Sequence, residues 1–344
     1  MSKTHTEVAK DANVSAAANI SSHLPRMAKE RPNQAAIMFP VKKEYQSWTY
    51  EQLNKAVDAY AHVMKAAGVS KGQKALVFLT CGPDLIATVF ALFKMGVLPV
   101  MLDPGMGKDN VRRCIEHVQP DVFIGIRLAH LMRWLYRKSF ASVKFNFTAN
   151  EWFPGCIELA KEAPKYTEPF PVTPVGEHET AAILFTSGST GKAKGVVYTH
   201  SIFQNQVKYL KELFNFKPGE LDMPGYPLFA LFDIALGMTS VIPRLDPSKP
   251  AACDPALLVE TMEEYNVTTC QGSPAIWRKV YNYCKDESIK LDTLKRLITF
   301  GAPIPTELLQ GMFSIMAEDA EIYTPYGATE SLPVAIIPGS YLVD

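Results

Sequence analysis

The chain has 344 residues, 47% of them hydrophobic, so it is long enough to bury a large core and to form two or three lobes. Its 35 basic and 35 acidic residues cancel, which leaves no overall field to hold nucleic acid or an anionic membrane. The six cysteines form no CxxC pair and have no His-rich spacing. We therefore expect reduced thiols in a cytosolic protein rather than a disulfide framework or a zinc site.

The N-terminal region shows no targeting or membrane signal. Residues 1–20 are polar and rich in Ala and Ser, without the apolar core of a secretory signal, and we expect a flexible tail there. The most apolar stretch, residues 85–102, is interrupted by Lys94, Gly96 and Pro99. A buried helix followed by a buried strand explains it better than a transmembrane segment, so a soluble, cytoplasmic location is expected.

Helical and strand patterns alternate through the first half of the chain. Thr49 and Gln52 form a capping-box pattern before a helix that ends at Gly68. Strands are predicted at 74–80, 97–102, 122–126 and 143–147, and helices at 84–95, 109–117 and 128–137. This alternation favours right-handed βαβ crossovers and a mainly parallel sheet. The sequence DPGMG (103–107) lies where a strand ends and a helix begins, a position that favours a tight turn, with ligand contact as the alternative.

Prolines and charges accumulate between residues 148 and 177, so we place a lobe boundary there. The expected division is a tail at 1–20, a first α/β lobe at 21–175 and a second α/β lobe at 176–344. Within the second lobe, Ser201 and Gln204 indicate a capping box at the start of a helix. Helices at 254–265 and 274–284 and strands at 268–271 and 297–300 follow.

The most informative stretch is AAILFTSGSTGKAKGVVYTH, residues 181–200. Two apolar strand patterns, 181–185 and 196–198, enclose a loop of small, polar and glycine residues. Backbone N–H groups, hydroxyl groups and lysines suit this loop to binding phosphate. The residues concerned are Thr186, Ser187, Gly188, Ser189, Thr190, Gly191, Lys192, Lys194 and Gly195. The loop is not a Walker A motif, because Thr186 replaces its first glycine and Ala193 follows Lys192, and no GxGxxG spacing occurs in it.

TSGSTGKAKGV resembles the phosphate loop of the adenylate-forming superfamily, which includes acyl-CoA synthetases, luciferases and the adenylation domains of peptide synthetases. A second motif of that superfamily, YGATE (326–330), follows at about the expected separation. The segments LDPGMG (102–107), PLFALFD (227–233), GSPA (272–275) and TPYGATESLPVA (324–335) look like the β-lactone synthetases of bacterial long-chain olefin biosynthesis. The resemblance implies an α/β fold: the large N-terminal domain of an adenylate-forming enzyme, with stacked βαβ lobes and mostly parallel sheets.

The resemblance also implies roles for individual residues. ATP binding is implied for Thr186, Ser187, Gly188, Ser189, Thr190, Gly191, Lys192, Gly301, Ala302, Pro303, Tyr326, Gly327, Ala328 and Thr329. Mg²⁺ is implied at Glu330 and Thr186, and catalysis by Lys192, Lys194, Thr329 and Glu330. Substrate contacts are implied for Phe229, Ala230, Phe232 and Asp233. Many acyl-activating relatives have His or an aromatic residue where this chain has Ala230, so a wider acyl channel is one expectation. On the sequence alone, residues 301–303 fit a strand-to-helix turn equally well.

By resemblance, the reaction is ATP-dependent adenylation of a carboxylate with release of pyrophosphate. In the β-lactone synthetases, the substrate is a long-chain 2-alkyl-3-hydroxy acid whose own hydroxyl then closes a lactone. A long-chain fatty acyl-CoA or acyl-AMP ligase is the alternative enzyme, and a nucleotide-binding fragment without turnover is a third hypothesis. No base for lactone closure is assigned. His200, expected at the end of a strand, is interpreted as structural.

The TGD motif of the superfamily, its hinge and its C-terminal lid with a catalytic lysine are not found after Glu330. We therefore expect the chain to be the N-terminal portion of a longer enzyme, poorly active alone. A complex with other enzymes of the same pathway stays open.

Overall fold

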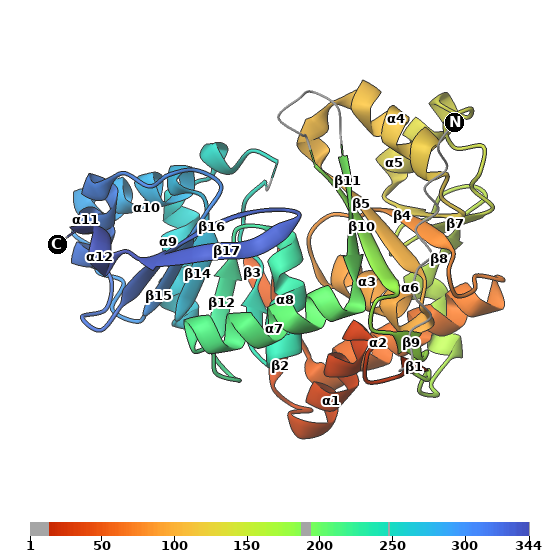
Figure 1. Cartoon of the computed structure of the whole chain (residues 1–344), viewed down its shortest axis with the longest axis horizontal. Coiled ribbons are helices and arrows are strands. Elements are labelled where there is room, and N and C mark those ends of the chain that lie inside the picture. The colour runs from red at the N-terminus through yellow and green to blue at the C-terminus, as the bar shows by residue number, and fades with distance from the viewer. Residues whose placement is uncertain (1–13, 187–193, 247, 344) are drawn as a thin grey trace, which may run out of the picture.

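The computed structural model describes residues 14–186, 194–246 and 248–343. Two large β-sheets with their helices lie beside each other along the long axis of the molecule (Figure 1). Helices α4 (Lys108–Val118) and α5 (Arg127–Leu135) lie at one end and α10 (Pro274–Asp286) and α11 (Thr306–Ile315) at the other. Helix α7 (His200–Phe214) runs across the middle (Figure 1). The expected α/β class with mainly parallel sheets is confirmed.

The first sheet has seven strands in the order β11-β10-β5-β4-β6-β7-β8. Its strands are β4 (Lys74–Phe78), β5 (Leu98–Leu102), β6 (Val122–Gly125), β7 (Phe145–Thr148), β8 (Ile157–Glu158), β10 (Thr180–Thr186) and β11 (Lys194–Thr199). All neighbouring pairs are parallel except β10 with β11, which form an antiparallel hairpin. The central strands read as short apolar runs because helices cover them, as is usual for parallel sheets.

The second sheet has eight strands in the order β17-β16-β15-β14-β12-β13-β2-β3. Its strands are β2 (Ala35–Val41), β3 (Glu44–Thr49), β12 (Leu221–Pro224), β13 (Thr239–Val241), β14 (Thr269–Gly272), β15 (Arg296–Thr299), β16 (Glu321–Ala328) and β17 (Ser331–Pro338). The six inner strands are parallel, and an antiparallel hairpin closes each edge. A further two-stranded sheet pairs β1 (Val14–Ser15) with β9 (Val175–Gly176).

The remaining helices are α1 (His23–Glu30), α2 (Tyr50–Ala66), α3 (Pro83–Met95), α6 (Leu159–Glu162), α8 (Ala230–Leu236), α9 (Pro255–Tyr265) and α12 (Ser340–Val343). Single 3₁₀ turns are η1 (Ile20–Ser22), η2 (Pro104–Met106), η3 (Ala163–Lys165), η4 (Pro227–Phe229) and η5 (Pro250–Ala252). Among the described residues, no helix combines the length and the apolarity needed to cross a membrane. All six cysteines are free thiols, and four of them are buried.

Helix α2 begins as its sequence predicts. Thr49 Oγ1 accepts a hydrogen bond from Gln52 N at 3.2 Å, and Gln52 Oε1 accepts one from Thr49 N at 2.8 Å. The two bonds satisfy backbone donors that the first helical turn leaves unpaired. The capping box is therefore confirmed, and the helix ends at Ala66, just before Gly68.

The start of α7 differs from the prediction. Thr199 is the cap, because its Oγ1 accepts from Ile202 N at 3.2 Å, and the Ser201 hydroxyl instead contacts Thr199 Oγ1 at 2.9 Å. The predicted Ser201–Gln204 capping box is wrong, since β11 leads directly into the helix and fixes its first turn two residues earlier. His200 is thus the first residue of α7 rather than the end of a strand.

The expected division of the chain at residue 175 does not coincide with the sheets. Strands β10 and β11, which follow that residue, complete the first sheet, whereas β2 and β3, from the N-terminal part, complete the second. Residues 14–20 also depart from the expected flexible tail. Asn19 is fully buried and its amide donates to Phe93 O at 2.7 Å and to Thr173 O at 3.1 Å.

Candidate active site

The phosphate-loop sequence connects two strands at the edge of the first sheet. Phe185 pairs with Gly195 and Thr186 with Lys194, so the strand–loop–strand prediction is confirmed on both sides. The loop residues Ser187, Gly188, Ser189, Thr190, Gly191 and Lys192 lie outside the described residues. Lys194 is exposed at the start of β11. Gly195 lies in the strand, where a Cβ atom would come within 2.8 Å of the Phe185 ring, so close packing explains this glycine better than the expected turn.

The YGATE residues form a second hairpin, at the edge of the other sheet. Tyr326 pairs with Ala335 and Ala328 with Ser331, which leaves Thr329 and Glu330 at the tip. Glu330 is exposed, and the Tyr326 side chain is 73% exposed. An exposed aromatic face beside a hairpin tip is suited to covering a flat ring such as adenine.

One hydrogen bond joins the two hairpins, and a second ties the YGATE hairpin to helix α7, although these segments are far apart in sequence. The Tyr198 hydroxyl on β11 donates to Thr329 O. The Gln206 amide on α7 donates to Leu332 O at 3.1 Å. Burial raises the pKa of Tyr198, and the nearby Glu330 carboxylate acts in the same direction. The Tyr198 hydroxyl therefore stays protonated at neutral pH and holds the YGATE tip against the strand that carries Lys194.

The expected adenine segment follows β15. Gly301 has φ of 88°, a left-handed conformation that favours glycine, and a Cβ atom there would meet no other atom within 4 Å. Backbone conformation rather than crowding therefore explains this glycine, and the space beside it is open. Ala302 and Pro303 are exposed next to it.

The DPGMG segment forms the expected tight turn, η2. The Asp103 carboxylate accepts a hydrogen bond from Gly105 N at 2.8 Å, as an Asx turn does. Asp103 also lies on the wall of the large cavity described next, so the segment is both a turn and a neighbour of the site.

A cavity of about 1190 Å³ extends between the two sheets. Apolar side chains of β4, α3, β5, β10 and α7 form much of its wall, among them Val77, Val89, Phe90, Met101, Leu184 and Val207. Gly327, Ala328, Thr329 and Gly301 line it as well. The volume exceeds the 300–1,000 Å³ typical of small-molecule sites, so the cavity has room for a long acyl chain in addition to a nucleotide.

The PLFALFD segment contributes part of the wall. Phe229 and Phe232 line the cavity, and the Phe229 ring packs edge-on to Phe300 with centroids 5.0 Å apart. Asp233 lines it too. Ala230 is fully buried and is not among the described residues that line the cavity. The wider acyl channel stays a prediction.

Of the other predicted residues, Tyr326, Glu330, Ala302 and Pro303 are not among the described residues of the cavity wall, although Gly327, Thr329 and Gly301 beside them in sequence are. The sequence reasoning missed Tyr198, Gln206, Asp222 and Gln271. The sequence pattern predicts only an apolar strand at Tyr198, because the role of its hydroxyl depends on a partner 131 residues away. An aspartate within the apolar strand pattern of β12 is the one signal that could have drawn attention to Asp222.

The chain matches the family model of the AMP-binding enzyme over residues 24–342. The chain belongs to the AMP-binding enzyme family. Within this family it is 39% identical over 332 residues to an olefin β-lactone synthetase of Xanthomonas campestris pv. campestris, covering 94% of this chain and 59% of that protein. It is 38% identical to an olefin β-lactone synthetase of Stenotrophomonas maltophilia, covering 94% of this chain and 60% of that protein. The AMP-binding chain thus spans about three fifths of the length of these relatives.

Solved structures of AMP-binding enzymes share the fold. A long-chain-fatty-acid–CoA ligase of Archaeoglobus fulgidus superposes with a TM-score of 0.80 at 18% identity, covering 92% of this chain and 65% of that one. A fatty acyl CoA synthetase of Mycobacterium tuberculosis gives a TM-score of 0.75 at 20% identity, covering 91% and 60%. At these identities the likeness concerns the fold alone.

Proposed function

We propose that the protein adenylates a long-chain 2-alkyl-3-hydroxy acid at the expense of ATP and then closes it to a β-lactone. The observation that carries the proposal is the meeting of two hairpins at one cavity. Tyr198 ties the YGATE tip to the phosphate-loop hairpin, and the large apolar cavity opens at the same place. The similarity to two olefin β-lactone synthetases supports the choice of substrate.

In the first step, a carboxylate oxygen of the acid attacks the α-phosphorus of ATP, and pyrophosphate leaves. Negative charge accumulates on the phosphoryl oxygens, so preorganised donors and cations contribute most. We assign these roles to the loop N–H groups, to Lys192 and Lys194, and to the hydroxyls of Thr186 and Thr329. Tyr198 would keep Thr329 in place through the carbonyl that it binds.

Glu330 fits a magnesium ion. A hard cation prefers carboxylate oxygen, and Mg²⁺ is commonly held by one or two carboxylates together with substrate phosphates. The Glu330 carboxylate is exposed at the hairpin tip, where a metal–nucleotide complex can reach it. When bound, Mg²⁺ would neutralise charge on the phosphates. Glu330 would hold it, with Thr186 as the second proposed ligand.

In the second step, the hydroxyl oxygen of the substrate attacks its own activated carbonyl carbon, and AMP leaves. An intramolecular nucleophile needs no external acceptor, because well-oriented groups reach effective molarities of about 10⁵ M or more. The cavity would align the two alkyl branches so that the hydroxyl faces the carbonyl. Its apolar wall would also exclude water, which otherwise hydrolyses the adenylate.

Product analysis tests the proposal. The full-length protein is supplied with ATP, Mg²⁺ and a 2-alkyl-3-hydroxy acid, with and without coenzyme A. We expect a β-lactone and AMP in the absence of coenzyme A. Thioester formed only when coenzyme A is added would instead identify a long-chain acyl-CoA ligase, and an enzyme-bound acyl-AMP that accumulates would identify an acyl-AMP ligase. Nucleotide binding by calorimetry without pyrophosphate release would contradict all three activities.

A further inference from the structure

Two buried carboxyl groups belong to β12 and α8, outside the phosphate-loop and YGATE hairpins, and one of them lines the cavity. Asp222 belongs to β12 and is 0% exposed. Asp233 belongs to α8, is 1% exposed, and forms part of the cavity wall. Burying an ionised carboxylate is costly unless a cation or several hydrogen bonds compensate for it, and two adjacent carboxylates cost more.

The pair lacks enough donors to hold two negative charges. The Gln271 amide donates to Asp222 Oδ2. Asp222 Oδ1 and Asp233 Oδ2, however, are buried without a hydrogen-bond partner among the described residues, although the two carboxyl groups interact with each other. A single proton held by the pair gives both oxygens a partner and leaves one charge instead of two.

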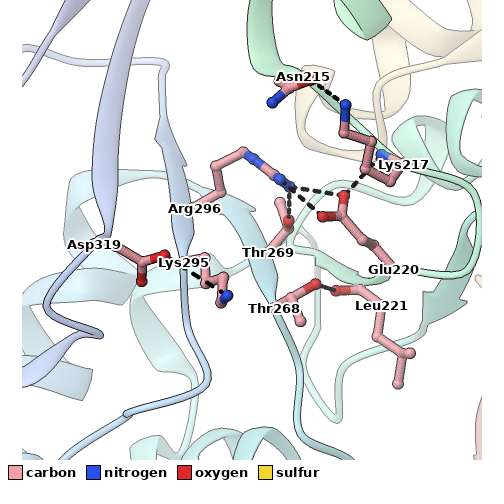
Figure 2. Close-up of polar contacts among 9 residues, drawn as sticks. All are labelled: Asn215, Lys217, Glu220, Leu221, Thr268, Thr269, Lys295, Arg296 and Asp319. Atoms are coloured by element: carbon pink, nitrogen blue, oxygen red, sulfur yellow. Dashed lines mark hydrogen bonds and ion pairs between the residues drawn. The ribbon is translucent and has the colours of Figure 1, made fainter.

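Among the described residues, the neighbouring groups do not balance a second negative charge on the Asp222–Asp233 pair. Arg296 is the cation that acts on Asp222, but its guanidinium is already bound to Glu220 by two hydrogen bonds of 3.1 and 2.9 Å (Figure 2). Arg296 also donates to Thr269 Oγ1 at 2.8 Å. The Tyr50 hydroxyl, near Asp233, donates instead to Met238 O at 2.6 Å.

Burial is the main cause that raises the pKa of Asp233, to about 7, and it raises the pKa of Asp222 well above its usual value. The Asp233 charge raises the pKa of Asp222 further, while the Ser240 hydroxyl on β13 favours the charged form of Asp233. At neutral pH, Asp222 therefore keeps the proton, and Asp233 is the member that exchanges one. A carboxylate with a pKa close to the working pH is well matched to proton transfer.

Asp233 is also better placed than the other carboxylates on the cavity wall. Asp103 accepts from Gly105 N, and Asp246 accepts from Ser248 N at 2.9 Å, so both close loops. Hydrogen bonds from Ser248 lower the pKa of Asp246 and make it a weaker base. Asp233 instead stands among the apolar side chains Phe229 and Phe232 of the same segment, where an acyl chain would lie.

We propose that Asp233 is the base that accepts the proton of the substrate hydroxyl during lactone closure, and that Asp222 and Gln271 are positioning residues that orient it. The assignment rests on the proposed lactone-forming function. The hydroxyl oxygen forms the new bond to the carbonyl carbon as its proton passes to Asp233. The bond from that carbon to the AMP oxygen breaks, and AMP leaves with the electron pair. Asp233 then returns the proton to solvent.

The test separates the two steps in the full-length protein. Pyrophosphate release is measured with a 2-alkyl acid that lacks the hydroxyl, and lactone formation is measured in a single turnover with the 2-alkyl-3-hydroxy acid. For Asp233→Asn we expect the rate of lactone closure relative to the rate of pyrophosphate release to fall about 100-fold or more, the usual contribution of a general base. Wild-type closure should rise with pH through about 7, and the variant should lack that rise.

Asp222 provides a matched pair of variants. An Asn side chain can accept from Gln271 and donate to Asp233, as the protonated carboxyl does, so Asp222→Asn should keep the rise of closure with pH. Asp222→Leu removes the donor to Asp233, which disfavours the charged base, so the rise should move to higher pH. The far-ultraviolet circular dichroism spectrum of each variant reports whether altering this buried cluster disturbs folding.

Three results would overturn the assignment. They are lactone closure by Asp233→Asn at the wild-type rate, an equal loss of both steps in that variant, and identical pH profiles for Asp222→Asn and Asp222→Leu. A wild-type protein that releases pyrophosphate but makes no lactone would refute the proposed function itself. That failure is recognised before any variant is measured.

Discussion

The burial of His200 gives a prediction about stability at acid pH. Its ring is 2% exposed, its Nδ1 accepts a hydrogen bond from Ile20 N at 3.2 Å, and the Phe93 ring packs edge-on to it. Burial lowers the pKa of His200 from 6.5 to about 4; Glu179 acts in the opposite direction and Lys71 in the same direction as burial. Because the folded pKa lies below the unfolded one, the unfolded chain takes up the proton first. The free energy of unfolding therefore decreases as pH falls from about 6.5 to about 4.

The size of the effect follows from the two pKa values. At pH 5 almost all unfolded chains carry the proton on this histidine and few folded ones do. The difference of about 1.5 pH units below 6.5 corresponds to about 2 kcal/mol, or a fall in Tm of roughly 3 °C for a chain of this size. His200→Asn keeps an acceptor near the Nδ1 position and cannot titrate. We expect the variant to lose about 2 kcal/mol less than the wild type between pH 7.5 and pH 5.

Thermal unfolding at pH 7.5, 6 and 5 measures this difference. Comparing slopes against pH removes any constant cost of the smaller side chain. His117→Asn is the matched control, because His117 is exposed on α4 and meets water in the folded and the unfolded chain alike. If His200→Asn and the wild type lose stability in parallel as the pH falls, the ring does not stay neutral in the folded protein and the reasoning is wrong.

Three further predictions concern buried charge, metal and the acyl chain. Lys94 and Asp58 form a buried ion pair between α2 and α3, so Lys94→Met should cost about 3–5 kcal/mol at pH 7 in urea unfolding, whereas Lys94→Met with Asp58→Leu should restore most of it. Glu330→Gln should slow pyrophosphate release by about 100-fold or more, since a neutral amide is a poor ligand for Mg²⁺, while the circular dichroism spectrum stays unchanged. Near-normal release would show that Glu330 is not a magnesium ligand. Val89 lines the cavity, and Val89→Phe should narrow it. We expect kcat/KM for an acid with a 16-carbon chain to fall about tenfold or more relative to that for an 8-carbon acid. An equal fall for both acids would place the acyl chain elsewhere.

Local sequence patterns predicted the central strands of the first sheet and the helices between them, because the causes of these elements are local. The strands β2, β3, β12, β13 and β17 of the second sheet were not predicted. The reciprocal bonds of Thr49 and Gln52 depend on residues three apart, and the glycine at position 96 ends α3 with φ of 68°. The alternation of strands and helices predicted parallel sheets for the same reason. Where a cap depended on the preceding strand, as at Thr199, the pattern of Ser201 and Gln204 was misleading.

The division into contiguous lobes failed because strand pairing is not local. Nothing in the residues of β10 shows that they pair with β5, about 80 positions earlier, nor does β2 reveal its pairing with β13. The proline-rich segment between residues 148 and 177 itself contains β8, the edge strand of the first sheet, and β9. It does not mark where one sheet ends and the next begins.

The candidate site also depends on contacts between residues that are far apart in sequence. The residue types of the phosphate loop and of YGATE indicate phosphate chemistry. The contacts that hold the YGATE hairpin in place, however, come from the Tyr198 hydroxyl and the Gln206 amide, and the sequence pattern predicts only a strand and a helix at these positions. Their roles in catalysis stay predictions. Asp222 gave no such signal, and for Asp233 the family resemblance implies only a substrate contact. Their pairing in the core, which no local pattern shows, makes them unusual.

The exchange of strands between the two halves has a consequence for binding. The cavity wall includes Val77 and Met101 from the N-terminal half, Leu184 from the phosphate hairpin, and Phe229 and Ile298 from the C-terminal half. Each sheet is complete only when strands from both halves have joined it. A cavity built in this way cannot form in either half alone, so the proposed acyl site requires both sheets to be folded. Binding of a long-chain acid should therefore stabilise the two sheets together, because the ligand gains its apolar contacts only in the complete structure.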